Sequence, residues 1–460
     1  MIRPSIRIKH PNWTTELVRD YTGAPDTPVA LESLVIKWGR EEWLDDRKPT
    51  SAEFRILVND DAVRTTANLF RYRQEIPVTI TAAGMTLFDG FISEVRAHKT
   101  TGRDTERYIF DVTAMDRTTE LYGHKSYLRD NMSNIIVAVD MAADDYLPQF
   151  KEKHKNLVGT LGKFSYPAER SKLIVIFSPY DLADSSLWTY ISRFYRSMNG
   201  LGWEWDPATH EIFQQVAPRG LEGIVSILAH STRGVEIVTD ASKASESNDV
   251  IDLDADSLRI DEIGFTIPQR MDVGFIDFAF WTTKDNPYYK EAHRVFTVGP
   301  GTRTVSMGGI NAGSGWEPAM KQFGQYVNTL GQFPKLPPVT FRFQDLDQKA
   351  RKWWLTTVQR PLIGLIQNSA LAEWLAPTAA YGADGYSPAV AAVGGVIEFN
   401  GSEWTVQHNL ELLPANSGPA DNPVTYSTLN ESRYKIGDYS PNTAWREFAA
   451  LPQHNTLKEK

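Results

Sequence analysis

Three aspartates at alternating positions, Asp252, Asp254 and Asp256, come closest in this sequence to the spacing of a metal site. Calcium loops use oxygen ligands at positions one, three and five, followed by glycine at position six and glutamate at position twelve. Ser257 and Ile263 occupy the two later positions, so both the turn residue and the bidentate ligand are lacking. We interpret the segment as a solvated acidic connection, because runs of charge usually lie on the surface.

Nucleotide and hydrolase motifs are also incomplete. Gly159, Gly162 and Lys163 resemble the end of a phosphate-binding loop, but Phe164 stands where a hydroxyl residue is needed. The glycines at 299, 301, 308 and 309 lack the spacing of a dinucleotide site. The sequence contains no Gly-x-Ser-x-Gly and no His-Glu-x-x-His motif, and its nine histidines are scattered singly. We predict no catalytic, cofactor-binding or metal-binding residue, no cofactor, and a protein that is not an enzyme.

Sugar chemistry stays open, because the two carboxylates of a glycosidase need not be close in sequence. The 13 tryptophans would suit a sugar site, but they are spread from Trp13 to Trp445, mostly within strand or helix patterns. We interpret them mainly as packing residues, because aromatic side chains bury large areas. Trp353 and Trp354 form the only adjacent pair, and one of them is expected at an interface.

Composition limits the class of protein. The chain has 460 residues, 48 basic against 57 acidic residues, a net charge of −9 and no cysteine. Disulfides, thiolate catalysis and cysteine-ligated zinc are therefore excluded. A net negative charge argues against broad DNA binding, which requires a basic surface. The start of the chain lacks the apolar core of a signal peptide, and no apolar run is long enough to span a bilayer.

The first part of the chain predicts short antiparallel strands. Alternating apolar residues place Ile2, Ile6 and Ile8 on one face of an initial strand. Further strands are expected over residues 31–38, ending at Gly39, and over 53–58, 77–81, 85–95 and 107–115, with a turn at 82–84 joining two of them. Residues 41–50 are predicted to form a charged connection. Strands at this spacing are typical of a barrel or sandwich.

The middle of the chain changes its periodicity. Helical spacing is present over 133–145 and 185–199, with Ser185 as N-cap and Gly200 as the stop of the second helix. Residues 203–206 and 211–213 flank a turn and predict a hairpin. Residues 239–263 carry eight acidic residues against Lys243 and Arg259, so they hold −6 of the net −9, and their first half is predicted to be a linker.

A second β-rich block follows the acidic connection. Strands are expected over 263–267, 273–281, 293–298, 303–307 and 338–343, and a short helix over 345–354. The best hairpin covers 394–406, because Asn400 and Gly401 favour the positive φ of a tight turn. We therefore predict a mainly β chain with an α+β middle. Its domains are a first tube-like β domain (1–118), a helix-plus-hairpin domain (119–238), an acidic connection (239–262), a second tube-like β domain (263–413) and an extended C-terminal arm (414–460).

Several segments together resemble the minor tail proteins of long-tailed phages of actinobacteria. They include the N-terminal stretches 34–40, 49–52 and 54–57, the strand 87–92, the mid-chain hairpin 201–208, and the C-terminal stretches 361–365, 393–397 and 404–405. The similarity is dispersed over about residues 30–413, and the order and spacing carry it. The charged run 41–48 and the acidic stretch 239–263 depart from the family's pattern.

That family resembles the trimeric hub of contractile phage baseplates, whose subunits each carry two tube-like β domains. The resemblance implies a non-catalytic hub at the distal end of a phage tail, in the virion after synthesis in the host cytoplasm. It implies a homotrimer that contacts a distal tail protein, a tape-measure protein and other tail-tip or receptor-binding proteins. DNA would pass through in transit, and no membrane insertion is implied. Two alternatives stay open: a receptor-binding protein for cell-surface carbohydrate, and a tail-associated cell-wall hydrolase.

Overall fold

The computed structural model describes a framework of strands with a few short helical segments. The described residues are 2–10, 13–18, 29–41, 45–59, 66–68, 70–71, 75–100, 107–123, 141–142, 164–165, 174–175, 186–189, 191–192, 200–216, 250–252, 273–282, 290–297, 303–311, 338–342, 363–365 and 389–413. Among these residues, no helix has the length and apolar character needed to cross a membrane. The expectation of a mainly β chain is confirmed by these elements.

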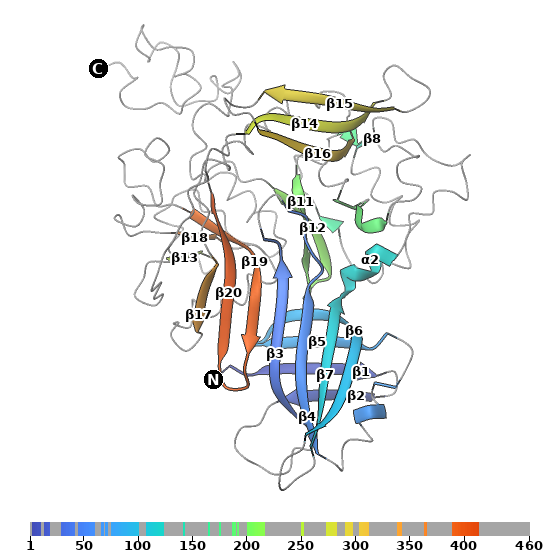
Figure 1. Ribbon diagram of the computed structural model, residues 1–460, viewed down its shortest axis with the longest axis vertical. Coiled ribbons are helices and arrows are strands. Elements are labelled where there is room, and N and C mark those ends of the chain that lie inside the picture. The colour runs from blue at the N-terminus through green and yellow to red at the C-terminus, as the bar shows by residue number, and fades with distance from the viewer. Residues whose placement is uncertain are drawn as a thin grey trace, which may run out of the picture.

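A curled antiparallel sheet forms the N-terminal half of the described structure. It contains β1 (Pro4–His10), β2 (Trp13–Val18), β3 (Val29–Gly39), β4 (Ser51–Asn59), β5 (Pro77–Ala82), β6 (Met85–Thr100) and β7 (Arg107–Asp116). Its strand order is β3-β4-β7-β6-β5-β1-β2. Figure 1 shows β3, β4 and β7 in front, with β1, β2 and β5 crossing behind them. We call these seven strands the curled sheet.

The core lies between the two layers of the curled sheet. In β5 buried and half-buried residues alternate along the strand, as expected when one face points inward. Ile6 and Ile8 of β1, Phe54 and Ile56 of β4, and Val112 of β7 are all at most 3% exposed. Burying side chains of this size contributes about 1.5–3 kcal/mol each. The sequence prediction that Ile6 and Ile8 share an inward face is confirmed, whereas Ile2 is half-buried.

Strand β6 connects the two layers because it bends. Its first half pairs with β5, through Pro77 opposite Phe91, and its second half pairs with β7, through Thr100 opposite Arg107. A Cβ on Gly90 would lie 2.1 Å from the Met115 carbonyl oxygen, so only glycine permits this close approach of the two strands. The ladder with β7 shifts register just beyond this point. A bulge of this kind increases the local bend of a strand.

The predicted turn between β5 and β6 is confirmed. Ala82 pairs with Met85, and the two residues between them have positive φ, 51° at Ala83 and 77° at Gly84. Two consecutive positive φ values define the tight hairpin turn whose twist matches the flanking strands. Nothing lies within 4 Å of a Cβ built on Gly84, so this glycine serves the turn alone.

The C-terminal hairpin joins the curled sheet directly. Strands β19 (Ala389–Phe399) and β20 (Trp404–Leu413) pair with each other, and β19 also pairs with β3, placing Ile397 opposite Ile36. The same sheet continues through β18 (Ile363–Leu365) to β13 (Val250–Asp252), while β17 (Val339–Arg342) pairs with β20. Strands from the first and the second predicted β domains therefore share one twelve-stranded sheet. The domain boundaries themselves stay predictions.

The turn of the C-terminal hairpin uses Asn400 and Gly401 differently from each other. Gly401 has a φ of 91°, whereas the Asn400 side chain accepts hydrogen bonds from the Ser402 and Glu403 amides at 3.0 and 2.9 Å. Asn400 also pairs through its backbone with Glu403, at 3.1 Å. The predicted hairpin is confirmed, and only the glycine of the pair adopts a positive φ.

The middle of the chain contributes a second hairpin. Strands β11 (Gly200–Asp206) and β12 (Glu211–Val216) pair in the predicted arrangement, and β12 also pairs with β9 (Phe164–Ser165). The 3₁₀ helix η1 (Arg117–Thr119) and helix α2 (Glu120–Gly123) follow β7. Figure 1 places this hairpin between the curled sheet and the strands of residues 273–311.

Two predictions about the helices of the middle region need correction. Residues 187–189 and 191–192 are helical as predicted. The Ser186 hydroxyl accepts the Thr189 amide at 3.2 Å, which is the N-cap contact predicted for Ser185. The predicted helix over 133–145 is contradicted at β8 (Met141–Ala142), which pairs with β10 (Ile174–Val175) as a short antiparallel ladder. A backbone paired with a distant strand cannot form the local hydrogen bonds of a helix. The other residues of these two segments lie outside the described ranges, apart from Gly200, which begins β11.

A separate sheet contains β14 (Val273–Thr282), β15 (Lys290–Thr297) and β16 (Arg303–Asn311). The predicted strands at these positions are confirmed, as is the strand at β17. β14 pairs antiparallel with β15 and parallel with β16. The predicted strand 263–267, the predicted helix 345–354, most of the acidic connection and the C-terminal arm lie outside the described residues.

Candidate functional site

A buried group of charged side chains lies where the curled sheet meets the β11–β12 hairpin. It begins at the end of β3, because Gly39 has a φ of 73° and turns the chain so that Arg40 points inward. A Cβ on Gly39 would lie 2.3 Å from the Val393 carbonyl oxygen, and one on Gly394 would lie 2.2 Å from that of Arg40. Glycine at both positions lets β3 and β19 approach closely enough to bury the arginine.

Arg40 contacts two distant parts of the chain. Its guanidinium donates to the Trp203 carbonyl at 3.0 Å and to the Glu204 carboxylate at 2.5 Å, both on β11. Its backbone amide donates to Val393 of β19 at 3.0 Å, and its carbonyl accepts from Asn409 of β20 at 3.0 Å. The residue therefore links the N-terminal, middle and C-terminal hairpins.

A second buried arginine, Arg47, lies beside Arg40 and Glu204, and it pairs with a second carboxylate, Asp116. The Arg47 guanidinium donates to Asp116 at 2.9 Å and to the Thr118 and Thr50 hydroxyls at 3.1 Å each. Its Nε also lies 3.8 Å from the second Glu204 oxygen. We call Arg40, Arg47, Asp116 and Glu204 the buried charge network; all four are at most 7% exposed.

Asp116 has a structural role besides its charge. It caps η1, accepting the Thr118 amide at 3.0 Å and the Thr118 hydroxyl, and it accepts the Thr50 amide at 2.8 Å. A carboxylate with this many donors is strongly held in one orientation. Two cations and two anions are thus enclosed together. Removing any one member of such a group is strongly destabilising, because it leaves a buried charge unpaired.

Aromatic side chains enclose the buried charge network on the hairpin side. The Trp203 ring packs against the Arg47 guanidinium at 5.5 Å and edge-on against Trp188 at 4.5 Å, and its Nε1 donates to Ser192 at 2.9 Å. Tyr122 of α2 stacks on Trp188 at 4.3 Å with its other surface partly exposed. The rings exclude water and so strengthen the ion pairs.

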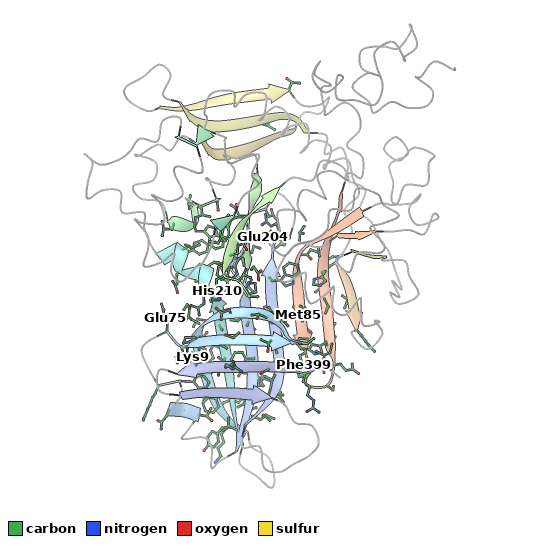
Figure 2. All side chains as sticks on the ribbon, turned by 180° about the vertical axis from the view of Figure 1, so that it is seen from behind. Lys9, Glu75, Met85, Glu204, His210 and Phe399 are labelled. Carbon is green, nitrogen blue, oxygen red and sulfur yellow. The ribbon has the colours of Figure 1, made fainter. Side chains whose placement is uncertain are left out.

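A second junction lies at the turn of the same hairpin. Asp89 of β6 accepts from the Thr79 hydroxyl at 2.8 Å, from the Arg117 guanidinium, and from His210 Nε2 at 3.0 Å. Burial raises the pKa of Asp89, but the hydrogen bonds from His210 and Arg117 outweigh it, so the pKa lies below its usual value. Figure 2 shows Glu204 and His210 on the hairpin, close to the strands of the curled sheet.

The sequence predicted no chemical site, and the described residues contain no group of three or more histidine or acidic side chains suited to a metal. Of the Asp252–Asp256 segment, only Asp252 lies within the described residues, at the end of β13. The five tryptophans whose burial is described, Trp38, Trp188, Trp203, Trp205 and Trp404, are at most 9% exposed. At these positions, packing rather than a sugar platform accounts for tryptophan. Trp353 and Trp354 lie outside the described residues.

The sequence alone did not identify Arg40 and Arg47 as the residues that join the N-terminal, middle and C-terminal hairpins. The sequence predicts a charged connection over residues 41–50, and Lys48 and Glu41 do pair at 2.7 Å in the exposed part of this segment. Arg47 is instead buried, because Asp116 and Glu204 reach it from elements distant in sequence. The only local signal is an arginine that follows Gly39 at the end of an apolar strand, and it does not identify a partner.

No protein-family model and no curated protein sequence matches the chain. Among solved structures, a 43 kDa tail protein of prophage MuSo2 from Shewanella oneidensis matches it with a TM-score of 0.50 at 8% identity, over 90% of this chain and 99% of that one. The chain shares its fold with a phage tail protein. A tail protein from Neisseria meningitidis MC58 gives a TM-score of 0.48 at 9% identity, over 88% of this chain and 96% of that one.

A third structure, the E. coli c3393 protein, gives a TM-score of 0.38 at 11% identity, over 84% of this chain and 75% of that one. It is described as a component of the type VI secretion system with structural similarity to the T4 bacteriophage tail proteins gp27 and gp5. The fold assignment rests on the Shewanella protein, because the match covers nearly the whole length of that protein.

Proposed function

We propose that this chain is a structural component of a phage-type tail, and that it acts there as a hub at the distal end. The observation that carries the proposal is the tail-protein fold, shared over 90% of the chain with the Shewanella prophage protein. In this role the chain joins the tail tube and distal tail protein to the tip and closes or guides the DNA channel. We propose that it is not an enzyme.

The internal construction suits a part that must transmit load. Strands from both ends of the chain share one sheet, and the buried charge network fixes the middle hairpin to that sheet. Movement between these elements would expose unpaired charges, so it is strongly disfavoured. A scaffold that holds its shape under force is what a tail requires, whereas a lid or hinge is more typical of an enzyme.

The proposed assembly is a homotrimer with a tape-measure protein and other tail-tip or receptor-binding proteins as neighbours. In the strand order of the described residues, β2 and β13 stand at the ends of the main path of the large sheet, and β17 ends the branch through β20. Sheet ends attract other strands, and closed rings of subunits cover them. The ring of three therefore gives these ends a partner. DNA is a passing molecule in this proposal, since the net charge of −9 favours sliding over retention.

Labelling of intact particles tests this location. Phage-type particles that incorporate the chain are incubated with gold-conjugated antibodies against it and imaged by electron microscopy. We expect label at the distal end of the tail. Label along the tail shaft, on the head, or absent from the particle would overturn the proposal. Clearing of host peptidoglycan in a zymogram, or saturable binding to purified wall glycan, would favour the hydrolase or carbohydrate-binding alternative instead.

A further inference from the structure

The turn between β19 and β20 places a side-chain amide next to a backbone nitrogen that has little steric protection. Asn400 is exposed to solvent and is followed directly by Gly401. Because glycine has no Cβ, its backbone nitrogen is open to approach by the preceding side chain. Only Cβ, Cα and the carbonyl carbon of Asn400 separate that nitrogen from the side-chain Cγ, so a bond between the two closes a succinimide ring.

Several donors converge on the side-chain oxygen of Asn400. Its Oδ1 accepts the backbone amides of Ser402 and Glu403 at 3.0 and 2.9 Å, and it also accepts the Ser402 hydroxyl at 3.0 Å. Donors at these distances polarise a carbonyl group, and they bind its oxygen more strongly once that oxygen carries negative charge. The turn therefore holds a preformed site for an oxyanion on Oδ1 of Asn400.

We propose that Asn400 is a site of spontaneous deamidation and that the folded turn accelerates the reaction. The Gly401 nitrogen attacks Cγ of Asn400 while its proton passes to a base in solution, and the electron pair of the C=O bond moves to Oδ1. The tetrahedral intermediate then collapses: the bond from Cγ to Nδ2 breaks, and Nδ2 takes up a proton and leaves as ammonia. Water opens the resulting succinimide, so one water is consumed and one ammonia is released without any oxidant or reductant.

The fold assists the step in which charge develops. In an unfolded chain only water stabilises the oxyanion, and the water molecules must reorient to do so. In the turn, the donors of Ser402 and Glu403 already point at Oδ1, and the Asn400 amide bonded to the Glu403 carbonyl at 3.1 Å keeps them in place. Donors that need no rearrangement lower the barrier to a charged intermediate.

The product alters the turn in one of two ways. Opening of the ring at Cγ gives aspartate, whose carboxylate accepts the same donors. Opening at the main-chain carbonyl carbon gives isoaspartate, which inserts Cβ into the main chain. The turn ends at Trp404, whose ring packs on Phe399 at 5.1 Å and whose Nε1 donates to the Ile2 carbonyl at 2.7 Å. Isoaspartate therefore weakens the contact that attaches the start of the chain to the C-terminal hairpin.

Incubation of the full-length chain in mildly alkaline buffer, with and without guanidinium chloride, tests the proposal. Peptide mass spectrometry measures the fraction of Asn400 converted to acid, and labelling with an isoaspartyl methyltransferase identifies isoaspartate. We expect conversion of Asn400 to be at least about threefold faster in the folded than in the denatured chain. In the denatured chain, Asn400 should react about as fast as Asn199, which is also followed by glycine.

A serine variant tests the contribution of the donors. Ser402→Ala removes the hydroxyl donor and keeps both backbone amides, so conversion of Asn400 in the folded chain should slow by about twofold or more. The control Ser93→Ala removes an exposed hydroxyl that donates to the Thr113 carbonyl at 3.1 Å, and it should leave the conversion of Asn400 unchanged.

Two results would overturn the proposal. The first is conversion of Asn400 that is no faster in the folded than in the denatured natural chain, a comparison that needs no variant. The second is conversion in folded Ser402→Ala that is as fast as in the natural chain. Neither result bears on the proposed location in a tail, which the particle labelling tests separately.

Discussion

The Arg40 guanidinium and the Glu204 carboxylate lie 2.5 Å apart, although 164 positions separate them in the chain. The arginine side chain is fully buried, and the glutamate nearly so. Because Arg40 also bonds to β19 and β20, this residue connects three hairpins that are distant in sequence.

Substitution Glu204→Gln should destabilise the protein strongly, because it leaves Arg40 and part of Arg47 without a buried counter-charge. We expect a loss of about 3–5 kcal/mol in the free energy of unfolding. Urea denaturation followed by tryptophan fluorescence measures the loss. The matched control is Glu41→Gln, which removes an exposed partner of Lys48 and should leave the free energy of unfolding almost unchanged, because water screens this pair. Equal losses in the two variants would contradict a buried network.

Substitution Asp116→Asn should remove the ion pair with Arg47 and keep the cap of η1, because asparagine caps a helix about as well as aspartate does. Leaving the buried Arg47 without its counter-charge should cost about 3–5 kcal/mol. Thermal unfolding of Asp116→Asn is compared with that of Asp111→Asn, whose carboxylate pairs with Arg55 on the exposed face of the same strand. A melting temperature lowered as much by Asp111→Asn would show that burial does not govern the effect.

Gly39→Ala tests the close approach of β3 and β19. Both Gly39 and Gly84 have positive φ, but a Cβ meets backbone atoms only at Gly39. The backbone conformation alone should cost Gly84→Ala about 1 kcal/mol. Gly39→Ala should cost at least about 2 kcal/mol more, since β19 must move away. Chemical denaturation of the two variants provides the comparison, and similar costs would show that the strands separate easily.

Glu120 provides a pH-dependent prediction with a defined sign. Burial raises the pKa of its carboxyl, and the neighbouring Glu75 raises it further. A group whose pKa is higher in the folded than in the unfolded chain favours folding at low pH, and this contribution is lost as the pH rises through the folded value. Glu120→Gln should therefore be more stable than the natural chain at pH 7, by less than about 1 kcal/mol because the group is half-exposed. The difference should shrink at pH 4, and a gain that grows on acidification would contradict the assignment.

Local structure was predictable where the signal is local. The alternation of apolar residues located β4, β7 and β14, and the turn chemistry around Gly84 and Gly401 located two hairpins. The pairing of β3 with β19 was not predictable, because it joins segments more than 350 positions apart and each strand would pair equally well with others. Arg47 is buried against Asp116 and Glu204, which are distant in sequence. Its burial therefore could not be predicted from residues 41–50 alone. His210 has no periodic signal, since its role comes from a turn.

The central claim, that the chain is an assembling part of a tail, is tested most directly by its mass in solution. Size-exclusion chromatography with light scattering of the purified full-length chain should give three times the 51.8 kDa of one subunit, the mass of a homotrimer. A mass of 51.8 kDa at every concentration measured would contradict the account.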